Sequence, residues 1–239
     1  MRQQRAIVIT FSGIDGAGKS TQIAKLCEYL ESLSLTFRTL EFWDDVVAFS
    51  RVREQASRKA FKGDLGVGSP INPISRRDKN VRSWYITMIR CAFYALDALS
   101  LRISFYRRRN RADVLIFDRY IYDELANLPL QRKIILIYMR AVLRIAPRPD
   151  VAFVLDADPE TATVRKPEYP LEFVRRNRDA YLQISRMIGM RVIPERSVEE
   201  IFQEIRDAIV EVCQERLVEP SHSHLQHSSV AASAKVRNG

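Results

Sequence analysis

The sequence predicts an α/β protein in which a parallel sheet carries helices on both faces. Two observations support this fold class. Short β-branched apolar segments alternate with longer segments of helical periodicity, a pattern typical of consecutive β-α-β units. A glycine-rich segment, residues 12–20, lies directly between the first apolar segment and the first helical one. Because ligands bind at the carboxyl ends of the strands in such sheets, we expect the functional site there.

Five segments are predicted strands and five are predicted helices. The strands are residues 6–11, 37–43, 113–118, 150–156 and 191–193. The helices are residues 21–34, 81–106, 130–145, 171–188 and 198–214. In the first helix Ile23, Leu26 and Leu30 recur at helical spacing and predict one buried face. The alternation of the two kinds of segment favours a doubly wound sheet.

Residues 44–82 interrupt this alternation. Glycine and proline are concentrated within residues 63–73, which predicts a loop. Residues 51–82 hold nine Lys or Arg but three Asp or Glu. We therefore interpret residues 44–82 as a basic loop insertion, with a solvated surface loop as the simplest alternative to a functional role.

Composition restricts the function classes. The chain has 239 residues, 46% hydrophobic and 28% charged, so we expect one soluble domain, residues 1–216, and a disordered tail, residues 217–239. No apolar run approaches the length of a membrane span, and we expect a cytoplasmic protein without a membrane partner. The three cysteines are scattered, and the histidines all lie in the tail, which excludes histidine acid–base chemistry from the domain. The net charge of +9 indicates an anionic ligand.

Residues 13–20, with the sequence GIDGAGKS, match the motif G-x-x-x-x-G-K-[ST] in full. Glycines let the backbone curl so that successive N–H groups face a bound phosphate, and the helix that follows adds its positive end. Lys19 is expected to reach the β- and γ-phosphates, and the Ser20 hydroxyl to bind Mg²⁺. The predicted ATP- and Mg²⁺-binding residues of this P-loop are Gly13, Asp15, Gly16, Ala17, Gly18, Lys19, Ser20 and Thr21.

Asp118 ends an apolar strand, the position expected of a second carboxylate near Mg²⁺. An aspartate at a strand end can instead cap a turn. Arg119 beside it favours the functional interpretation, because a guanidinium next to that carboxylate suits a phosphate clamp.

Four segments together resemble the thymidylate kinase family of P-loop nucleoside monophosphate kinases. They are residues 11–22 (FSGIDGAGKSTQ), 118–120 (DRY), 149–160 (PDVAFVLDADPE) and 173–181 (FVRRNRDAY), in the family's order over about residues 6–213. The resemblance implies a five-stranded parallel sheet, a P-loop and a short lid, residues 161–175. It also implies transfer of the γ-phosphoryl group of Mg-ATP to a nucleoside monophosphate, dTMP giving dTDP. Such a transfer depends on positioning and positive charge, which a domain without histidine can supply.

The resemblance implies an arginine near the transferred phosphoryl group. The P-loop has no arginine, so the lid must supply the cation. Arg165 is the first candidate, and Lys166 and Arg175 are the alternatives. A basic helix face without a catalytic role is the alternative for Arg175, Arg176 and Arg178. The implied catalytic residues are Lys19, Asp118, Arg119 and Arg165.

On the acceptor side the resemblance implies four residues. Asp15 corresponds to the acid that contacts the acceptor sugar, and Phe93 to the aromatic ring that stacks on the acceptor base. Arg119 and Tyr120 belong to the family's Asp-Arg-Tyr element. A helical phenylalanine such as Phe93 is, however, more often part of a core.

Several acceptor-side residues depart from the family's pattern. Asp97 stands where the family has an arginine for the acceptor phosphate, so Arg90, Arg102 or the 51–82 segment must substitute, or the acceptor differs. Residues 121–127 lack the family's Ser/Thr and Gln, and residues 40–43 replace its Arg-Glu-Pro-Gly.

Three hypotheses follow. The first is a thymidylate kinase or close relative with a small nucleotide acceptor. The second is a kinase of the same fold that acts on a nucleoside, sugar or other small hydroxyl compound. The third is a nucleotide-dependent switch whose basic segments, such as residues 107–111, bind nucleic acid, although no nucleic-acid-binding motif is present and we do not expect this partner. The apolar helix 85–106 is also compatible with a homodimer.

Overall fold

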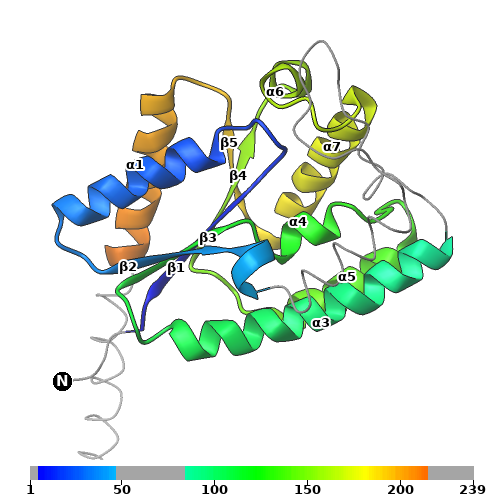
Figure 1. The fold of residues 1–239 in the computed structure, drawn as a ribbon, viewed down its shortest axis with the longest axis horizontal. Helices are drawn as coiled ribbons and strands as arrows, with labels where there is room; N and C mark the ends of the chain where they lie inside the picture. The colour runs from blue at the N-terminus through cyan, green and yellow to red at the C-terminus, as the bar shows by residue number, and fades with distance from the viewer. Residues whose placement is uncertain (1–4, 47–83, 215–239) are drawn as a thin grey trace, which may run out of the picture.

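The computed structural model describes residues 5–46 and 84–214, and its centre is a five-stranded parallel sheet. The strands are β1 (Ile7–Ser12), β2 (Phe37–Glu41), β3 (Val114–Asp118), β4 (Val151–Asp156) and β5 (Arg191–Pro194). Their order is β2-β3-β1-β4-β5 (Figure 1). All five strands lie where the sequence predicts them, and the predicted α/β fold class is confirmed.

The order of the strands determines where a ligand can bind. β1 is central and pairs with β3 on one side and β4 on the other. The connections that leave β1 and β3 therefore run in opposite directions across the sheet, which opens a crevice at the carboxyl end of β1. Phe11 of β1 is in register with Asp118, so the ends of β1 and β3 lie at one level.

Helices cover both faces of the sheet (Figure 1). On one face lie α1 and the helical residues 198–214, which meet where Tyr29 packs edge-on against Phe202. On the other face α3 and α5 lie side by side. The bounds are α1 (Lys19–Ser32), α3 (Trp84–Arg108), α4 (Ile121–Leu125), α5 (Lys133–Ile145), α6 (Pro159–Arg165) and α7 (Leu171–Ile188).

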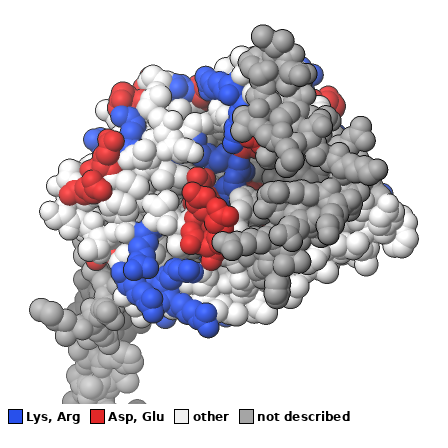
Figure 2. Space-filling model, in the orientation of Figure 1, with Lys and Arg blue, Asp and Glu red and all other residues white. Residues whose placement is uncertain are grey.

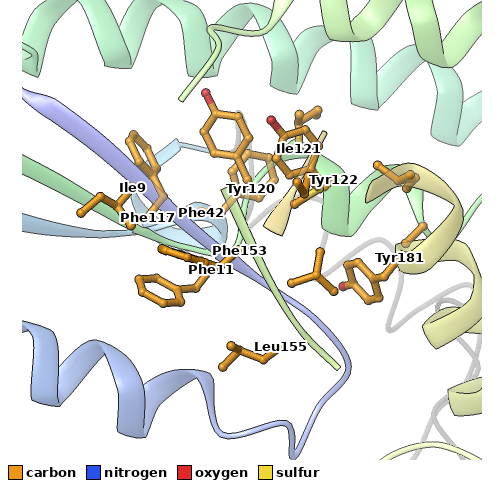
Figure 3. Packing of buried hydrophobic residues seen from close by; sticks show 14 of the residues in the cluster. Ile9, Phe11, Phe42, Phe117, Tyr120, Ile121, Tyr122, Phe153, Leu155 and Tyr181 are labelled. Atoms are coloured by element: carbon orange, nitrogen blue, oxygen red, sulfur yellow. The ribbon is translucent and has the colours of Figure 1, made fainter. Parts of the chain in front are cut away.

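Aromatic rings fill the core on both sides of the sheet (Figure 3). Phe11 and Phe153 stack at a centroid distance of 5.3 Å, and Phe117 meets Tyr120 edge-on at 5.3 Å. These four side chains are completely buried. Because both faces of the sheet are covered, the inner strands β1, β3 and β4 are mostly buried along their length, which is why the sequence shows them as apolar runs.

Two short helices were not predicted. α4 has five residues and α6 has seven, too few for a helical period to be visible. α6 does have a start signal: the Asp158 side chain accepts a hydrogen bond from the Thr161 backbone, and Pro159 is its first residue. The predicted lid, residues 161–175, therefore includes the end of α6 and the first turn of α7 around the connecting residues 166–170.

Other differences lie at element ends. β2 stops at Glu41 rather than at residue 43, because Phe42–Val46 forms the π-helical turn η1. Residues 44–46, predicted as loop, belong to this turn. The rest of the predicted basic insertion and the predicted tail lie outside the described residues. Within the described ranges, no helix is long and apolar enough to cross a membrane.

Candidate active site

The P-loop, residues 13–20, connects β1 to α1 at the crevice of the sheet. Gly13 and Gly16 have φ angles of 138° and 86°, which side chains rarely adopt. A Cβ atom at Gly13 would lie 2.6 Å from the Leu155 carbonyl oxygen, and one at Gly16 would lie 2.5 Å from that of Ala162. Glycine is thus required at both positions, because the loop packs directly on the backbone of β4 and α6.

A cavity of about 570 Å³ opens at this loop. P-loop residues 15–20 line it together with Thr21, Asp118 and Arg119 at the end of β3, and Arg165 and Lys166 of the predicted lid. The structure thus places all four implied catalytic residues, separated by up to 146 positions, around one space. Figure 2 shows basic side chains gathered at a hollow near the centre of the face that it draws, next to acidic side chains.

Lys19 is a buried cation at the cavity. Its side chain is 7% exposed, and Nζ donates hydrogen bonds of 2.9 Å to the carbonyl oxygens of Gly13 and Ile14. Burial lowers the pKa of Lys19 to about 8; Arg119 acts in the same direction, and Asp15 opposes it. The ammonium is therefore held inside the loop at a cost that a bound anion would offset.

Asp118 and Ser20 form the site suited to a metal ion. The Oδ1 atom of Asp118 is buried without a hydrogen-bond partner in the protein. Burial raises the pKa of Asp118, while Lys19 and Arg119 oppose the rise. Mg²⁺ is commonly held by one or two protein oxygens together with phosphate oxygens and water, so this carboxylate and the Ser20 hydroxyl fit it. Among the described residues no three His, Cys, Asp or Glu lie together as a metal site.

Arg119 lies between two carboxylates. Its Nη2 bonds to Asp15 Oδ1, and its Nη1 lies 3.2 Å from Asp123 Oδ1. Burial alone would lower the pKa of Arg119, but Asp15 and Asp123 raise it above its ordinary value. The residue has a φ of 69°, a left-handed conformation that is uncommon for residues other than glycine. Its backbone N–H donates to the Phe11 carbonyl oxygen at 2.9 Å.

The lid candidates are placed differently. Arg165 Nη2 lies 2.8 Å from Glu195 Oε1, and its Nη1 lies 3.5 Å from the Gly16 carbonyl oxygen. Lys166 Nζ lies 3.9 Å from Asp15. Arg175 instead pairs with Glu160 at the surface and does not line the cavity. Arg165 and Lys166 are thus the lid cations at the cavity.

Two predicted acceptor residues lie elsewhere. Tyr120 is completely buried, and its hydroxyl donates to the Pro147 carbonyl oxygen at 2.7 Å, so this side chain serves packing rather than the predicted acceptor contact. Phe93 is half-buried against the core and does not line the cavity. Asp97 is completely buried on α3. The sequence did not point to Asp123, whose only visible signal is its i+4 spacing from Arg119.

A phosphate-binding loop at the crevice of a parallel sheet, with a buried lysine, a carboxylate and an arginine beside it, defines a P-loop nucleotide kinase. Comparison with known proteins makes the class more specific. Over 183 residues the chain is 31% identical to a thymidylate kinase from Rickettsia typhi, covering 74% of this chain and 78% of that protein. The chain belongs to the thymidylate kinase family.

Other comparisons agree with this membership. A thymidylate kinase from Symbiobacterium thermophilum is 27% identical over 231 residues, 88% of this chain and 96% of that one. The structure of a thymidylate kinase from Candida albicans has the same fold, with a TM-score of 0.59 and 17% identity over 88% of this chain and 93% of that one. No protein-family model matches the chain. Membership in a kinase family favours the first two hypotheses over a nucleotide-dependent switch.

Proposed function

We propose that this nucleoside monophosphate kinase transfers the γ-phosphoryl group of Mg-ATP to dTMP. The observation that carries the proposal is the convergence of Lys19, Arg119 and Arg165 on one P-loop cavity in a member of the thymidylate kinase family. An acceptor phosphate oxygen forms a bond to the γ-phosphorus, the bond from that phosphorus to the β,γ-bridging oxygen breaks, and ADP leaves. The protein needs no covalent step for this reaction.

The described residues supply position and charge. Backbone N–H groups of the P-loop and the Lys19 ammonium bind the β- and γ-phosphates. Arg119 and a lid cation, Arg165 or Lys166, stabilise the charge on the transferred group. Ser20 and Asp118 would hold Mg²⁺, which neutralises charge on the donor phosphates when bound.

For the acceptor phosphate we propose Arg90. It precedes Asp97 by seven positions on α3, so both lie on one helix face. The carboxyl-terminal end of α3 lies at the start of β1, where Ala6 donates to the Arg109 carbonyl oxygen. Arg90 is therefore nearer than Asp97 to the carboxyl ends of the strands and to the cavity. Arg102, by contrast, donates to the carbonyl oxygen of Ile145, the last residue of α5, at the end of that helix that faces away from the cavity.

An acceptor panel tests the proposal. Purified protein with ATP and Mg²⁺ is given dTMP, the other deoxynucleoside monophosphates, thymidine and simple sugars, and ADP release is measured. We expect turnover with dTMP and none with thymidine, and the Lys19→Ala variant gives the background. Turnover of thymidine or a sugar without turnover of dTMP would contradict the proposal.

A second candidate is the same transfer to an acceptor without a phosphate. It is favoured by Asp97, because a buried carboxylate, not a cation, stands at the position where the family has its phosphate-binding arginine. The same panel separates the two candidates, because this one predicts turnover of a nucleoside or sugar.

We also propose a homodimer formed through α3. Apolar side chains at helical spacing are exposed along this helix; they are Tyr85, Ile89, Leu96, Leu99, Ile103 and Tyr106. Such a stripe on a soluble domain indicates a protein interface. Light scattering after gel filtration should give a dimer, and Leu96→Asp with Leu99→Asp should give a monomer. A monomeric wild-type protein would contradict this part of the proposal.

A further inference from the structure

The carboxylate of Asp123 accepts four hydrogen bonds, two from its own turn and two from distant parts of the chain. Its Oδ2 accepts from Ser12 Oγ at 2.7 Å and from the Tyr120 backbone N–H at 3.0 Å. Its Oδ1 accepts from the Tyr181 hydroxyl at 2.7 Å and from Arg119 Nη1 at 3.2 Å. Asp123 is 2% exposed and does not line the cavity.

A buried carboxylate at this position calls for an explanation. Removing a carboxylate from water is expensive, and the attraction to one cation rarely repays the cost unless further hydrogen bonds are made. Here all four bonds are made, and one of them goes to the cation that faces the cavity. An apolar side chain would pack the base of α4 with less cost but would leave the buried Arg119 guanidinium with Asp15 as its carboxylate partner.

The backbone of Arg119 depends on the same carboxylate. Its left-handed conformation is strained for a residue with a side chain. Such a conformation persists when the surrounding structure holds it. The bond from the next residue's N–H to Asp123 Oδ2, and the bond from Arg119 N–H to Phe11, hold the turn on both sides.

Asp123 also connects Arg119 to the lid. Tyr181 lies on α7, whose first turn belongs to the lid. α7 lies against α4 near this point, where Asn177 Nδ2 is 3.4 Å from the Ala126 carbonyl oxygen. A displacement of α7 therefore acts on the same oxygen atom that holds the Arg119 guanidinium.

We propose that Asp123 is a positioning residue for phosphoryl transfer, which holds the Arg119 guanidinium at the cavity and links it through Tyr181 to the helix that follows the lid. The proposal rests on phosphoryl transfer at this cavity, but it is independent of the identity of the acceptor. Asp15 occupies one side of the guanidinium and faces the cavity, whereas Asp123 holds the other side from within the protein.

The Asp123→Asn variant tests the proposal, because it keeps the shape and removes the charge. We expect kcat to fall about 100-fold, the effect of losing one positioned electrostatic group, with KM for ATP changed less than about threefold. A role in stability alone would lower the melting temperature and the active fraction without exposing Arg119. Asp150→Asn is the matched control, since the same change is made at a carboxylate that also accepts a backbone hydrogen bond, from Val8 at 2.8 Å, but lies directly before β4, at the end of the sheet away from the cavity.

A second readout does not depend on activity. Phenylglyoxal modifies accessible arginines, and mass spectrometry locates the reaction at Arg119. We expect Arg119 to react several-fold faster in Asp123→Asn than in the wild-type protein or in Asp150→Asn. An unchanged modification rate, or a kcat within threefold of wild type, would overturn the proposal. A wild-type protein without kinase activity refutes the proposed function, while the modification rates still decide whether Asp123 holds Arg119.

Two further variants keep the test decisive if Asp123→Asn does not fold. Tyr181→Phe and Ser12→Ala each remove one hydrogen bond to the carboxylate but retain its charge. Each is expected to lower kcat about fivefold, the equivalent of one hydrogen bond, and to accelerate the modification of Arg119. If both variants match the wild-type protein in kcat and in modification rate, Asp123 does not position Arg119.

Discussion

The donor side of the active site and the acceptor side that we propose are built in different ways. The donor side consists of the P-loop, residues 13–20, whose function depends on backbone shape and on the packing of two glycines against β4 and α6. The acceptor side that we propose consists of α3, η1 and α4, none of which lines the P-loop cavity, and there individual side chains would decide what binds. A site made from backbone tolerates few substitutions, whereas a site made from side chains can change its ligand by changing a few residues. The departures from the family's pattern at residues 97 and 121–127 fall on the second side.

The largest expected effect is at the donor side. Lys19→Ala removes the buried ammonium and should lower turnover by about 1,000-fold or more, because positioned charge supplies most of the catalysis in phosphoryl transfer. The melting temperature should not fall, since the lowered pKa of Lys19 shows that the fold disfavours its charge. Lys25→Ala is the control on the same helix, because Lys25 pairs with Glu199 at the surface. An active Lys19→Ala variant would refute the P-loop assignment.

A second prediction compares two glycines with similar positive φ angles, Gly16 at 86° and Gly189 at 73°. Gly16→Ala places a Cβ atom 2.5 Å from the Ala162 carbonyl oxygen, whereas Gly189→Ala, with a φ of 73°, meets nothing within 4 Å. Both should lose about 1 kcal/mol or more of stability from backbone strain. Gly16→Ala alone should also weaken ATP binding about 100-fold or more, because the loop must move away from α6. Calorimetric titration with Mg-ATP and thermal melts measure the two effects, and equal ATP affinity in both variants would show that loop shape does not control binding.

The contrast between the two sides also explains what the sequence could predict. The P-loop could be predicted because its functional residues are eight consecutive positions. Asp118 could be predicted because it ends an apolar strand. The hydrogen bonds of Asp123 could not be predicted from the sequence, since its partners Ser12 and Tyr181 are 111 and 58 positions away. Whether a side chain faces the cavity was also hidden: Tyr120 and Arg119 are neighbours, yet Tyr120 points into the core.

On the acceptor side Arg90→Ala should raise KM for dTMP about tenfold or more, as expected for the loss of one charge-assisted hydrogen bond. KM for ATP should not change, because Arg90 does not line the P-loop cavity. Arg102→Ala on the same helix is the control, as its guanidinium is held at Ile145. Steady-state kinetics with each substrate varied in turn separate the two constants. Equal KM values for dTMP in both variants would favour an acceptor without a phosphate.

The smallest effect is a pH dependence that belongs to the donor side alone. Phosphate binds the protonated form of Lys19, whose pKa burial lowers to about 8, so ATP affinity should fall about tenfold between pH 7 and pH 9. Stability without ATP should change in the opposite direction. Between about pH 8 and its ordinary pKa near 10.5, Lys19 is protonated in the unfolded chain but largely neutral in the folded one, so unfolding takes up a proton. Unfolding therefore becomes less favourable as pH rises, and the contribution of Lys19 to stability increases over that window.

Titration calorimetry with Mg-ATP and thermal melts across this pH range measure the two trends. Lys19→Arg should flatten the ATP trend, since an arginine stays charged throughout. We expect no such dependence of the KM for the acceptor on Lys19, because the acceptor contact that we propose, Arg90, lies outside the P-loop cavity. A pH dependence of the same size for both substrates would mean that the two sides share one titrating group, and the division between a backbone-built donor side and a side-chain-built acceptor side would fail.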